Sequence, residues 1–209
     1  GGGKGGVSVD AGELSLMEKE RVARGYVRSA GRILSPDRDV PAPDVATGTQ
    51  EMAWMVDEYA AIAGSIEPHA FTGKPVSLGG ITGRTPATGR GGLIALETMR
   101  KSLGLDSGEG LTIALQGLGN AGSWFARAAA KAGHTIVAAS DSSGMVSDTD
   151  GLDVEKLVDA KADGGSVTDY DGGETSDDGS AIIETECDVL VLAALGGVLA
   201  DKDDVKRLN

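Results

Sequence analysis

The sequence predicts an α/β protein with a helical first part and a second part in which strands and helices alternate. In the first part, residues 14–34 and 49–63 carry apolar side chains at helical spacing and are separated by a proline-containing segment. In the second part, the apolar run at 111–116 suits a buried parallel strand, an alanine-rich helix follows at 123–132, and a second strand-like run occupies 135–140. A strand, a helix and a strand at this spacing indicate a parallel, right-handed α/β unit.

The other elements complete this pattern. We predict, in chain order, a glycine-rich loop at 72–92, helices at 93–103 and 153–161, an acidic surface excursion at 163–180 and a third buried strand at 187–195. The boundary between the two parts is placed near residue 72, which gives domains of 1–72 and 73–209.

The composition excludes several classes of function. The formal net charge of −13 argues against nucleic acid and against an anionic membrane surface as partners. No apolar run approaches the roughly 20 residues that span a bilayer, and no set of metal ligands is predicted. Such acidity is typical of a very soluble protein, and we interpret it as adaptation to a salt-rich cytoplasm, where salt screens the repulsion between surface charges.

Two further features of the composition concern the core and the compartment. Aromatic residues make up only 3% of the chain, while it contains 33 glycines, so the core must be built from small aliphatic side chains. The single cysteine, Cys187, excludes an internal disulfide and suggests a reducing, cytoplasmic location. The chain opens with Gly-Gly-Gly-Lys-Gly-Gly rather than Met, which we interpret as a truncated start.

The motif Gly117-x-Gly119-x-x-Gly122 lies between the first predicted strand and the helix that follows. Here Gly117 would permit a tight turn, Gly119 would let a pyrophosphate approach the backbone, and Gly122 would let the helix pack on the sheet. The helix N-terminus would offer N–H donors to phosphates, and Asp141, at the end of the second strand, could accept hydrogen bonds from ribose hydroxyls. The alternative is an ordinary glycine turn. The context favours a doubly wound, Rossmann-type dinucleotide-binding domain.

Three other residue groups are candidates for chemistry. The glycines around Lys4 leave room for substrate, and burial of this lysine would lower its pKa and suit it to proton transfer; a solvated terminal lysine is the alternative. Two prolines stiffen the approach to Asp44, which could equally be a turn-capping aspartate. The string Arg84-x-x-x-Thr88-Gly-x-Gly could form an anion or amide pocket before a helix, or a charged surface loop.

Together these strings resemble the glutamate dehydrogenase family over essentially the whole chain. The resemblance rests on GGGKGG, DVPAPD, MAWMVDEY, TGKP, LGG-x-TGR-x-x-ATGRG, GLGNAG and SDSSG, which follow the order and spacing of that family. It implies that the first domain is part of a substrate domain and that the second is a truncated dinucleotide-binding domain.

The resemblance also implies roles for individual residues. Lys4 matches the catalytic lysine and Asp44 the catalytic aspartate, while Arg84 and Thr88 match residues that border the nicotinamide. The residues that match the rest of the cofactor site are Gly117, Gly119, Asn120, Ala121, Gly122, Asp141, Ser142, Ala193 and Ala194. After them come Gly196 and Gly197, where the family usually has a polar pair.

The implied reaction is the reversible oxidative deamination of L-glutamate to 2-oxoglutarate and ammonium, with NAD or NADP as cofactor. The resemblance further implies a homohexamer and a cleft that closes around the substrate. A related dehydrogenase of the leucine, phenylalanine or valine type is one alternative, although the PAPD string favours glutamate. A non-catalytic, nucleotide-binding regulatory subunit is another, and the presence of both Lys4 and Asp44 counts against it. A carboxylate at Asp141 usually favours NAD, but both cofactors occur in this family.

Overall fold

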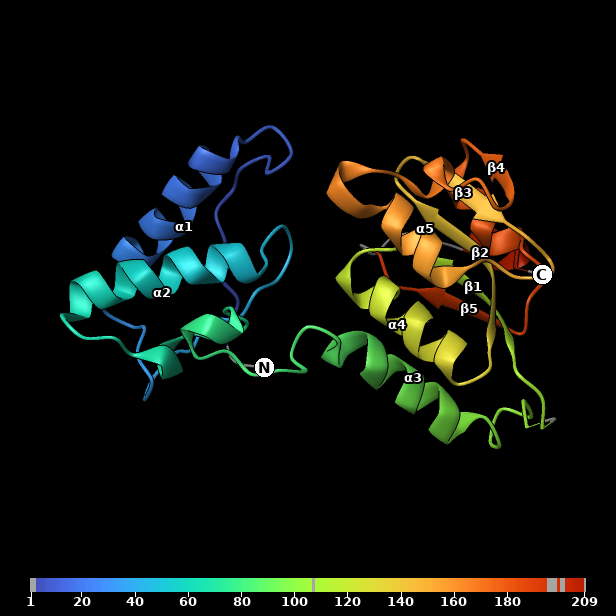
Figure 1. The fold of residues 1–209 in the computed structure, drawn as a ribbon, viewed down its shortest axis with the longest axis horizontal. Helices are drawn as coiled ribbons and strands as arrows, with labels where there is room; N and C mark the ends of the chain where they lie inside the picture. The colour runs from blue at the N-terminus through green and yellow to red at the C-terminus, as the bar shows by residue number, and fades with distance from the viewer. Residues whose placement is uncertain (1–2, 107, 195–198, 200–201, 209) are drawn as a thin grey trace. The chain divides into compact units, whose positions relative to one another are not determined.

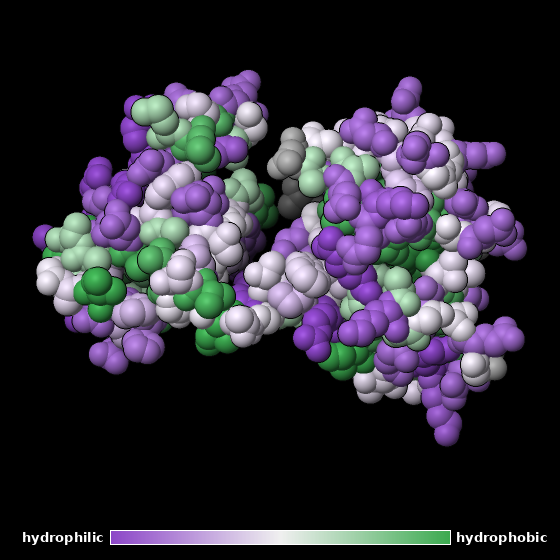
Figure 2. Space-filling model, viewed as in Figure 1, coloured by the Kyte–Doolittle hydropathy of each residue, from purple (hydrophilic) through white to green (hydrophobic). Residues whose placement is uncertain are grey.

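The computed structural model describes residues 3–106, 108–194, 199 and 202–208 (Figure 1). The chain divides into two compact units, Gly1–Arg84 and Thr85–Asn209. We predicted a boundary near residue 72 from the sequence, and the division into functional domains stays a prediction. Within the described residues, no helix is both long enough and apolar enough to cross a membrane. Hydrophilic residues cover much of the visible face of each unit (Figure 2).

The first unit is built on two helices. These are α1 (Leu16–Ala30) and α2 (Thr49–Ala63), and two short 3-10 helices follow, η1 (Pro68–Ala70) and η2 (Val76–Leu78). A capping box begins α1, because the Ser15 hydroxyl accepts from the Glu18 N–H and the Glu18 carboxylate accepts from the Ser15 N–H. The predicted helix at 49–63 is confirmed, and the one at 14–34 is confirmed with shorter ends.

Burial of apolar side chains between α1 and α2 stabilises this unit. Its core consists of Ala23, Val27, Leu34, Met52, Met55, Val56, Tyr59, Ala70 and Phe71. Ion pairs also join the helices: Arg24 contacts Asp57 at 2.7 Å, and Arg28 contacts Glu58 at 2.6 Å. Because Asp57 and Arg28 are largely exposed, these pairs contribute less than the apolar core.

The second unit contains a mixed sheet. Its described strands are β1 (Thr112–Gln116), β2 (Thr135–Asp141), β3 (Gly144–Ser147), β4 (Glu174–Ser176) and β5 (Val189–Leu192). They lie in the spatial order β4-β3-β2-β1-β5. Strand β1 pairs in parallel with β2 and β5, whereas β3 pairs antiparallel with β2 and β4. The predicted α/β class and the parallel β1–β2 pairing are confirmed, and an antiparallel extension is added to them.

Both faces of this sheet are covered. Alternate residues of β1 point to opposite faces, so Ile113 and Leu115 join the core beneath the helices, whereas Ala114 packs with Ile182 and Ile183 on the other side. The described helices of the second unit are α3 (Ala87–Met99), α4 (Asn120–Lys131), α5 (Val154–Ala160) and α6 (Lys202–Lys206), with 3-10 helices η3 (Ala162–Gly164), η4 (Val167–Asp169) and η5 (Gly179–Glu184). Figure 1 shows α4 and α5 side by side over the sheet.

The structure corrects two predictions in the later part of the chain. Residues 163–180 are not only a surface excursion, because η4 and β4 lie within them and the side chains of Val167 and Tyr170 are buried in the core. The strand predicted at 187–195 is present as β5 but is not fully buried. It lies at the edge of the described sheet, and Leu192 is 42% exposed. Residue 195, at the end of that prediction, lies outside the described residues.

The glycine-rich segment before α3 gives a third correction. We predicted a loop up to residue 92 and a helix over 93–103, but α3 begins at Ala87 and includes three glycines. A Cβ on Gly89 would lie 2.4 Å from the backbone nitrogen of Phe125 in α4. Glycine is therefore needed here for close packing between two helices. Its low helical propensity wrongly suggested that this segment is a loop.

We predict that Gly89→Ala and Gly91→Ala have opposite effects on stability. The Gly89 change should destabilise the second unit by about 1–3 kcal/mol, because its new methyl group meets backbone atoms that cannot move aside. A Cβ on Gly91 meets nothing within 4 Å, so alanine there should stabilise the helix by up to about 1 kcal/mol. Denaturant unfolding of both variants checks this, and a change of the same sign in both would contradict the close packing at Gly89.

Candidate functional site

The turn between β1 and α4 is shaped by two glycines that touch backbone atoms. Gly117 has φ +89°, a left-handed conformation that favours glycine, and a Cβ on it would lie 2.8 Å from the Ala194 nitrogen. A Cβ on Gly122 would lie 1.8 Å from the Gly117 carbonyl oxygen. A larger residue at Gly122 would push α4 away from the end of β1, and one at Gly117 would push away the backbone of Ala193 and Ala194.

The third glycine of the motif has open space beside it. A Cβ on Gly119 would meet nothing within 4 Å, and Gly119 is the N-cap residue of α4. The next three residues, Asn120 to Gly122, form the first turn of the helix, where backbone N–H groups have no partner within the helix. This combination of open space, N–H donors and positive helix potential fits a phosphate group.

The start of α3 lies beside this turn. The side-chain amide of Asn120 donates to the Thr85 carbonyl at 3.1 Å, and the buried Gly89 packs on Ala121 and Phe125. Thr88 is exposed in the first turn of α3, adjacent to Gly89. The structure therefore brings Thr88 and Asn120 onto neighbouring helix ends. Arg84 is the last residue of the first unit, where it is half-buried.

The carboxylate of Asp141 is surrounded by donors from its own chain. Its Oδ1 accepts from the Ser143 N–H at 2.8 Å and from the Ser166 hydroxyl at 3.3 Å. Its Oδ2 accepts from the Val167 N–H at 3.0 Å and lies 2.7 Å from the Lys161 ammonium. The side chain is only 6% exposed, so a ribose hydroxyl would have to replace one of these donors or share an oxygen with it.

These donors determine the charge state of Asp141. Burial alone would raise the pKa of its carboxyl group, but the hydrogen bonds from Lys161, Ser143 and Val167 together outweigh burial and lower the pKa below its ordinary value. The carboxylate is therefore ionised at neutral pH, and the Lys161 ammonium compensates its charge. Lys161 was not predicted, because in the sequence it is an ordinary lysine near the end of a predicted helix.

Other residues that were predicted to contact the cofactor, and some that were not, lie at the carboxyl ends of β1, β2 and β5. Ala193 donates its N–H to the Gln116 carbonyl at 2.8 Å, which places Ala193 and Ala194 against Gly117. Ser142 is exposed at the turn after β2. Gly196 and Gly197 lie outside the described residues. A hollow at this edge is lined by Gln116, Asp141, Ser142, Gly179, Ser180, Ile183, Asp204 and Arg207.

Two buried polar atoms near this edge have no hydrogen-bond partner among the described residues. They are the Gln116 Oε1 and the Ser140 Oγ, and neither has a hydrogen bond in the described part of the chain. Gln116 lines the hollow, and Ser140 accepts the Gly117 N–H through its carbonyl at 2.7 Å. Buried polar atoms without a partner are rare in folded proteins, and a polar ligand in the hollow that Gln116 lines could supply one. The described residues contain no group of three or more His, Cys, Asp or Glu side chains placed to hold a metal ion.

The first unit brings Lys4 and Asp44 into contact. The Lys4 ammonium donates to Asp44 Oδ2, although forty residues separate them, and both side chains are exposed, by 87% and 56%. The proline segment that carries Asp44 is fastened at Pro41, whose carbonyl accepts the Thr72 N–H at 2.9 Å. A Cβ on Gly73 would lie 2.5 Å from the Pro43 ring, so glycine is required for this packing.

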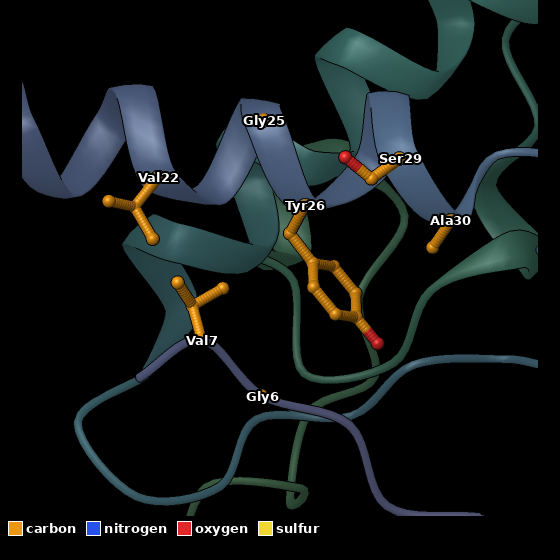
Figure 3. A pocket seen from close by; sticks show the side chains of 7 residues that line it. All are labelled: Gly6, Val7, Val22, Gly25, Tyr26, Ser29 and Ala30. Atoms are coloured by element: carbon orange, nitrogen blue, oxygen red, sulfur yellow. The ribbon is translucent and has the colours of Figure 1, made fainter. Parts of the chain in front are cut away.

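The glycine string that carries Lys4 lies against α1. A Cβ on Gly5 would lie 2.7 Å from the Tyr26 hydroxyl oxygen. Figure 3 shows the Tyr26 ring extending from α1 toward Gly6, with Val7 facing Val22. These contacts hold the glycine string against α1 and so direct Lys4 toward the proline segment.

The Lys4 contact sets the ionisation of Asp44. The hydrogen bond from Lys4 lowers the pKa of the Asp44 carboxyl below its ordinary value, and the N–H of Val45, which donates to Oδ1 at 2.9 Å, acts in the same direction. Asp44 is therefore a carboxylate at neutral pH, able to accept a proton, and it lies next to an ammonium group that can donate one.

Comparisons with known proteins agree on one family. A family model described as glutamate/leucine/phenylalanine/valine dehydrogenase matches residues 79–209, and a model of the dimerisation domain of Glu/Leu/Phe/Val dehydrogenases matches residues 1–61. The chain is 36% identical to the hetero-hexameric glutamate dehydrogenase of Thermus thermophilus in its Leu-bound form, with a TM-score of 0.85 over 96% of this chain and 47% of that one.

Two further solved structures are similar. The glutamate dehydrogenase of Peptoniphilus asaccharolyticus is 32% identical, with a TM-score of 0.61 over 90% of this chain and 43% of that chain. Another glutamate dehydrogenase is 27% identical, with a TM-score of 0.85 over 95% of this chain and 45% of the other. The present chain thus spans less than half the length of each of these relatives.

We predict that Lys4→Met raises the pKa of Asp44 toward the ordinary aspartate value, because the main hydrogen bond to the carboxylate is lost. Carbon-13 NMR titration of the Asp44 carboxyl measures this directly. A lowered pKa contributes stability that is present above the unfolded-state value and is lost as the pH falls through the folded-state value, so in the variant this contribution should be smaller and its loss should be complete at a higher pH. Lys101→Met, an exposed lysine in the second unit, is the matched control. An unchanged Asp44 titration in Lys4→Met would mean that the pair does not exist in solution.

Proposed function

Because this chain belongs to the glutamate, leucine, phenylalanine and valine dehydrogenase family, we propose that its protein interconverts L-glutamate with 2-oxoglutarate and ammonium by NAD(P)-dependent oxidative deamination. The observation that carries the proposal is the contact between Lys4 and Asp44, two residues that GGGKGG and DVPAPD single out. An ammonium beside a carboxylate can donate and accept the protons that move at the amino-acid nitrogen and at the attacking water. The solved relatives described as glutamate dehydrogenases support glutamate as substrate.

In this proposal Lys4 and Asp44 divide the proton transfers. Lys4 promotes attack of water on the substrate's iminium carbon and stabilises the negative charge that develops on oxygen. Asp44, which is ionised before substrate binds, takes protons from the substrate nitrogen and returns them. Both groups are exposed in this structure, so water must be excluded from them when the reaction proceeds.

The second unit would hold the cofactor. Members of this family use NAD or NADP, and the bound cofactor would supply the acceptor for the hydride of the substrate α-carbon. The open space at Gly119 and the N–H groups of Asn120, Ala121 and Gly122 would bind the pyrophosphate. We assign Asp141 and Ser142 to the region of the adenosine ribose. The remaining contacts would come from Arg84, Thr88, Ala193 and Ala194.

The proposal also covers the oligomeric state of the protein and the salt concentration in which it works. We propose a homohexamer. The hetero-hexameric state stated for the Thermus thermophilus relative supports an assembly of six subunits, and the match to a dimerisation domain supports contacts between subunits. We also propose that the protein works in a salt-rich cytoplasm, since a net charge of −13 keeps a surface hydrated and is tolerated best where salt screens it.

We predict that the complete protein forms NAD(P)H when glutamate is added at high salt. The rate with glutamate should exceed the rates with leucine, phenylalanine and valine. Lys4→Met and Asp44→Asn should each lower kcat by roughly 10²–10⁴-fold, as expected for loss of a general acid or base. Absorbance at 340 nm follows the reaction. A folded protein that binds nucleotide but is inactive with all four amino acids would favour a regulatory subunit.

We predict that the Asp141–Lys161 pair sets the choice between NAD and NADP. Asp141→Ser should raise NADP use relative to NAD, because it removes a charge that repels a 2′-phosphate and leaves the Lys161 ammonium without its main partner. Lys161→Met should lower that ratio, because Asp141 then carries an uncompensated charge. We expect each ratio to shift by roughly tenfold, which is the size of one partly screened charge interaction.

Ratios of kcat/KM for the two cofactors measure this preference, and Lys156→Met, on the same helix, is the control. If both ratios stay at the wild-type value, the pair has no part in cofactor discrimination.

A further inference from the structure

The four residues from Asp44 to Thr47 form a turn with an unusual backbone. Ala46 has φ 54°, and it is the only non-glycine residue with positive φ in the part of the chain that the structure describes. Alanine in this left-handed region is strained by its Cβ, which approaches the carbonyl oxygen. Such strain persists only where surrounding interactions hold it, and it is often found at functional sites.

The Thr47 hydroxyl is what holds this turn. It accepts the Asp44 N–H at 2.7 Å and donates to the Asp44 carbonyl at 2.9 Å. The Thr47 N–H also donates to that carbonyl, at 3.1 Å. Both polar groups of the Asp44 backbone are thus bound by one residue, which restricts the Asp44 φ and ψ angles and so sets the direction of its Cα–Cβ bond.

The turn also separates the two oxygens of the Asp44 carboxylate. Oδ1 accepts from the Val45 N–H at 2.9 Å, within the turn. Oδ2 is directed outward to the Lys4 ammonium. The hydrogen bond to Oδ1 therefore orients the carboxylate, and Oδ2 is left to contact the Lys4 ammonium.

Capping of α2 does not require this arrangement. The N-cap of α2 is Gly48, and its N–H donates to the Glu51 carboxylate at 2.8 Å. The Thr47 hydroxyl points back to Asp44 and contributes nothing to that cap. A purely structural account of Thr47 as a helix cap therefore has no support in its hydrogen bonds.

We propose that Thr47 is a positioning residue, which acts with the strained backbone at Ala46 to hold Asp44 against Lys4. The proposal rests on the catalytic role proposed for Asp44, and it adds the residue that makes an exposed carboxylate well ordered. A buried carboxylate is ordered by the groups packed around it, but the Asp44 side chain is 56% exposed. Local hydrogen bonds must therefore order it instead.

The first test measures geometry in the present chain. Thr47→Val keeps the shape of the side chain and removes the hydroxyl, so the Asp44–Lys4 contact should loosen and the carbon-13 titration of the Asp44 carboxyl should move up toward the ordinary aspartate range. Thr47→Ser restores a hydroxyl and should restore the titration. Thr49→Val, the same change two residues later at the start of α2, is the matched control and should leave it unaltered.

The second test measures activity in the complete protein. Thr47→Val should lower kcat on the order of 10- to 100-fold, as misplacement of a reacting group does, with KM for the cofactor unchanged, and Thr47→Ser should recover most of the loss. Ala46→Gly removes the strain and frees the turn, so kcat should fall while the melting temperature is kept or raised.

The outcomes separate this proposal from the proposed function. If Thr47→Val lowers the melting temperature but leaves both the Asp44 titration and kcat unchanged, Thr47 is structural and the proposal is overturned. Failure of Thr47→Ser to rescue the titration would overturn it as well. If the wild-type protein is inactive with glutamate, the proposed function fails, and the Asp44 titration alone still decides whether Thr47 positions that carboxylate.

Discussion

Close approach between backbone segments, which only glycine permits, is the constraint on which the second unit depends. The first turn of α4 can lie at the end of β1 because Gly122 meets the Gly117 carbonyl, and α3 can lie on α4 because Gly89 meets the backbone of Phe125. Where the chain leaves space instead, at Gly119, a ligand can approach. The same residue type thus has two opposite uses within one motif, and only the packing around each position distinguishes them.

The two candidate carboxylates, Asp44 in the first unit and Asp141 in the second, are held in contrasting ways. Asp141 is buried to 6% exposure and bound by four donors of its own chain, so its charge is compensated before any ligand arrives. Asp44 is exposed and is ordered by a short turn, with one oxygen directed at Lys4. A compensated carboxylate suits the recognition of a ligand's charge, whereas an exposed and ordered one suits proton transfer, provided that water is later excluded.

Prediction from the sequence succeeded where a pattern is local. The helix at 49–63, the β1–turn–α4–β2 unit and its glycines follow from periodicity and from residue types that have few alternatives. It failed where packing overrides local preference. The glycines at the start of α3 read as a loop, because nothing in the sequence shows that α4 lies within contact distance. Strands β3 and β4 are short, and pairing with β2 rather than their own sequence makes them strands.

By itself the sequence determined the class of the fold, the identity of the glycine turn and the residue types able to transfer protons, because these depend on local chemistry and on spacing along the chain. The tertiary structure decided which groups meet. It brought Lys4 to Asp44 across forty residues, gave Asp141 the ammonium of Lys161, and turned Thr47 back upon Asp44. Such contacts depend on how distant segments pack together, and a single sequence contains no direct record of distances between residues that are far apart along the chain.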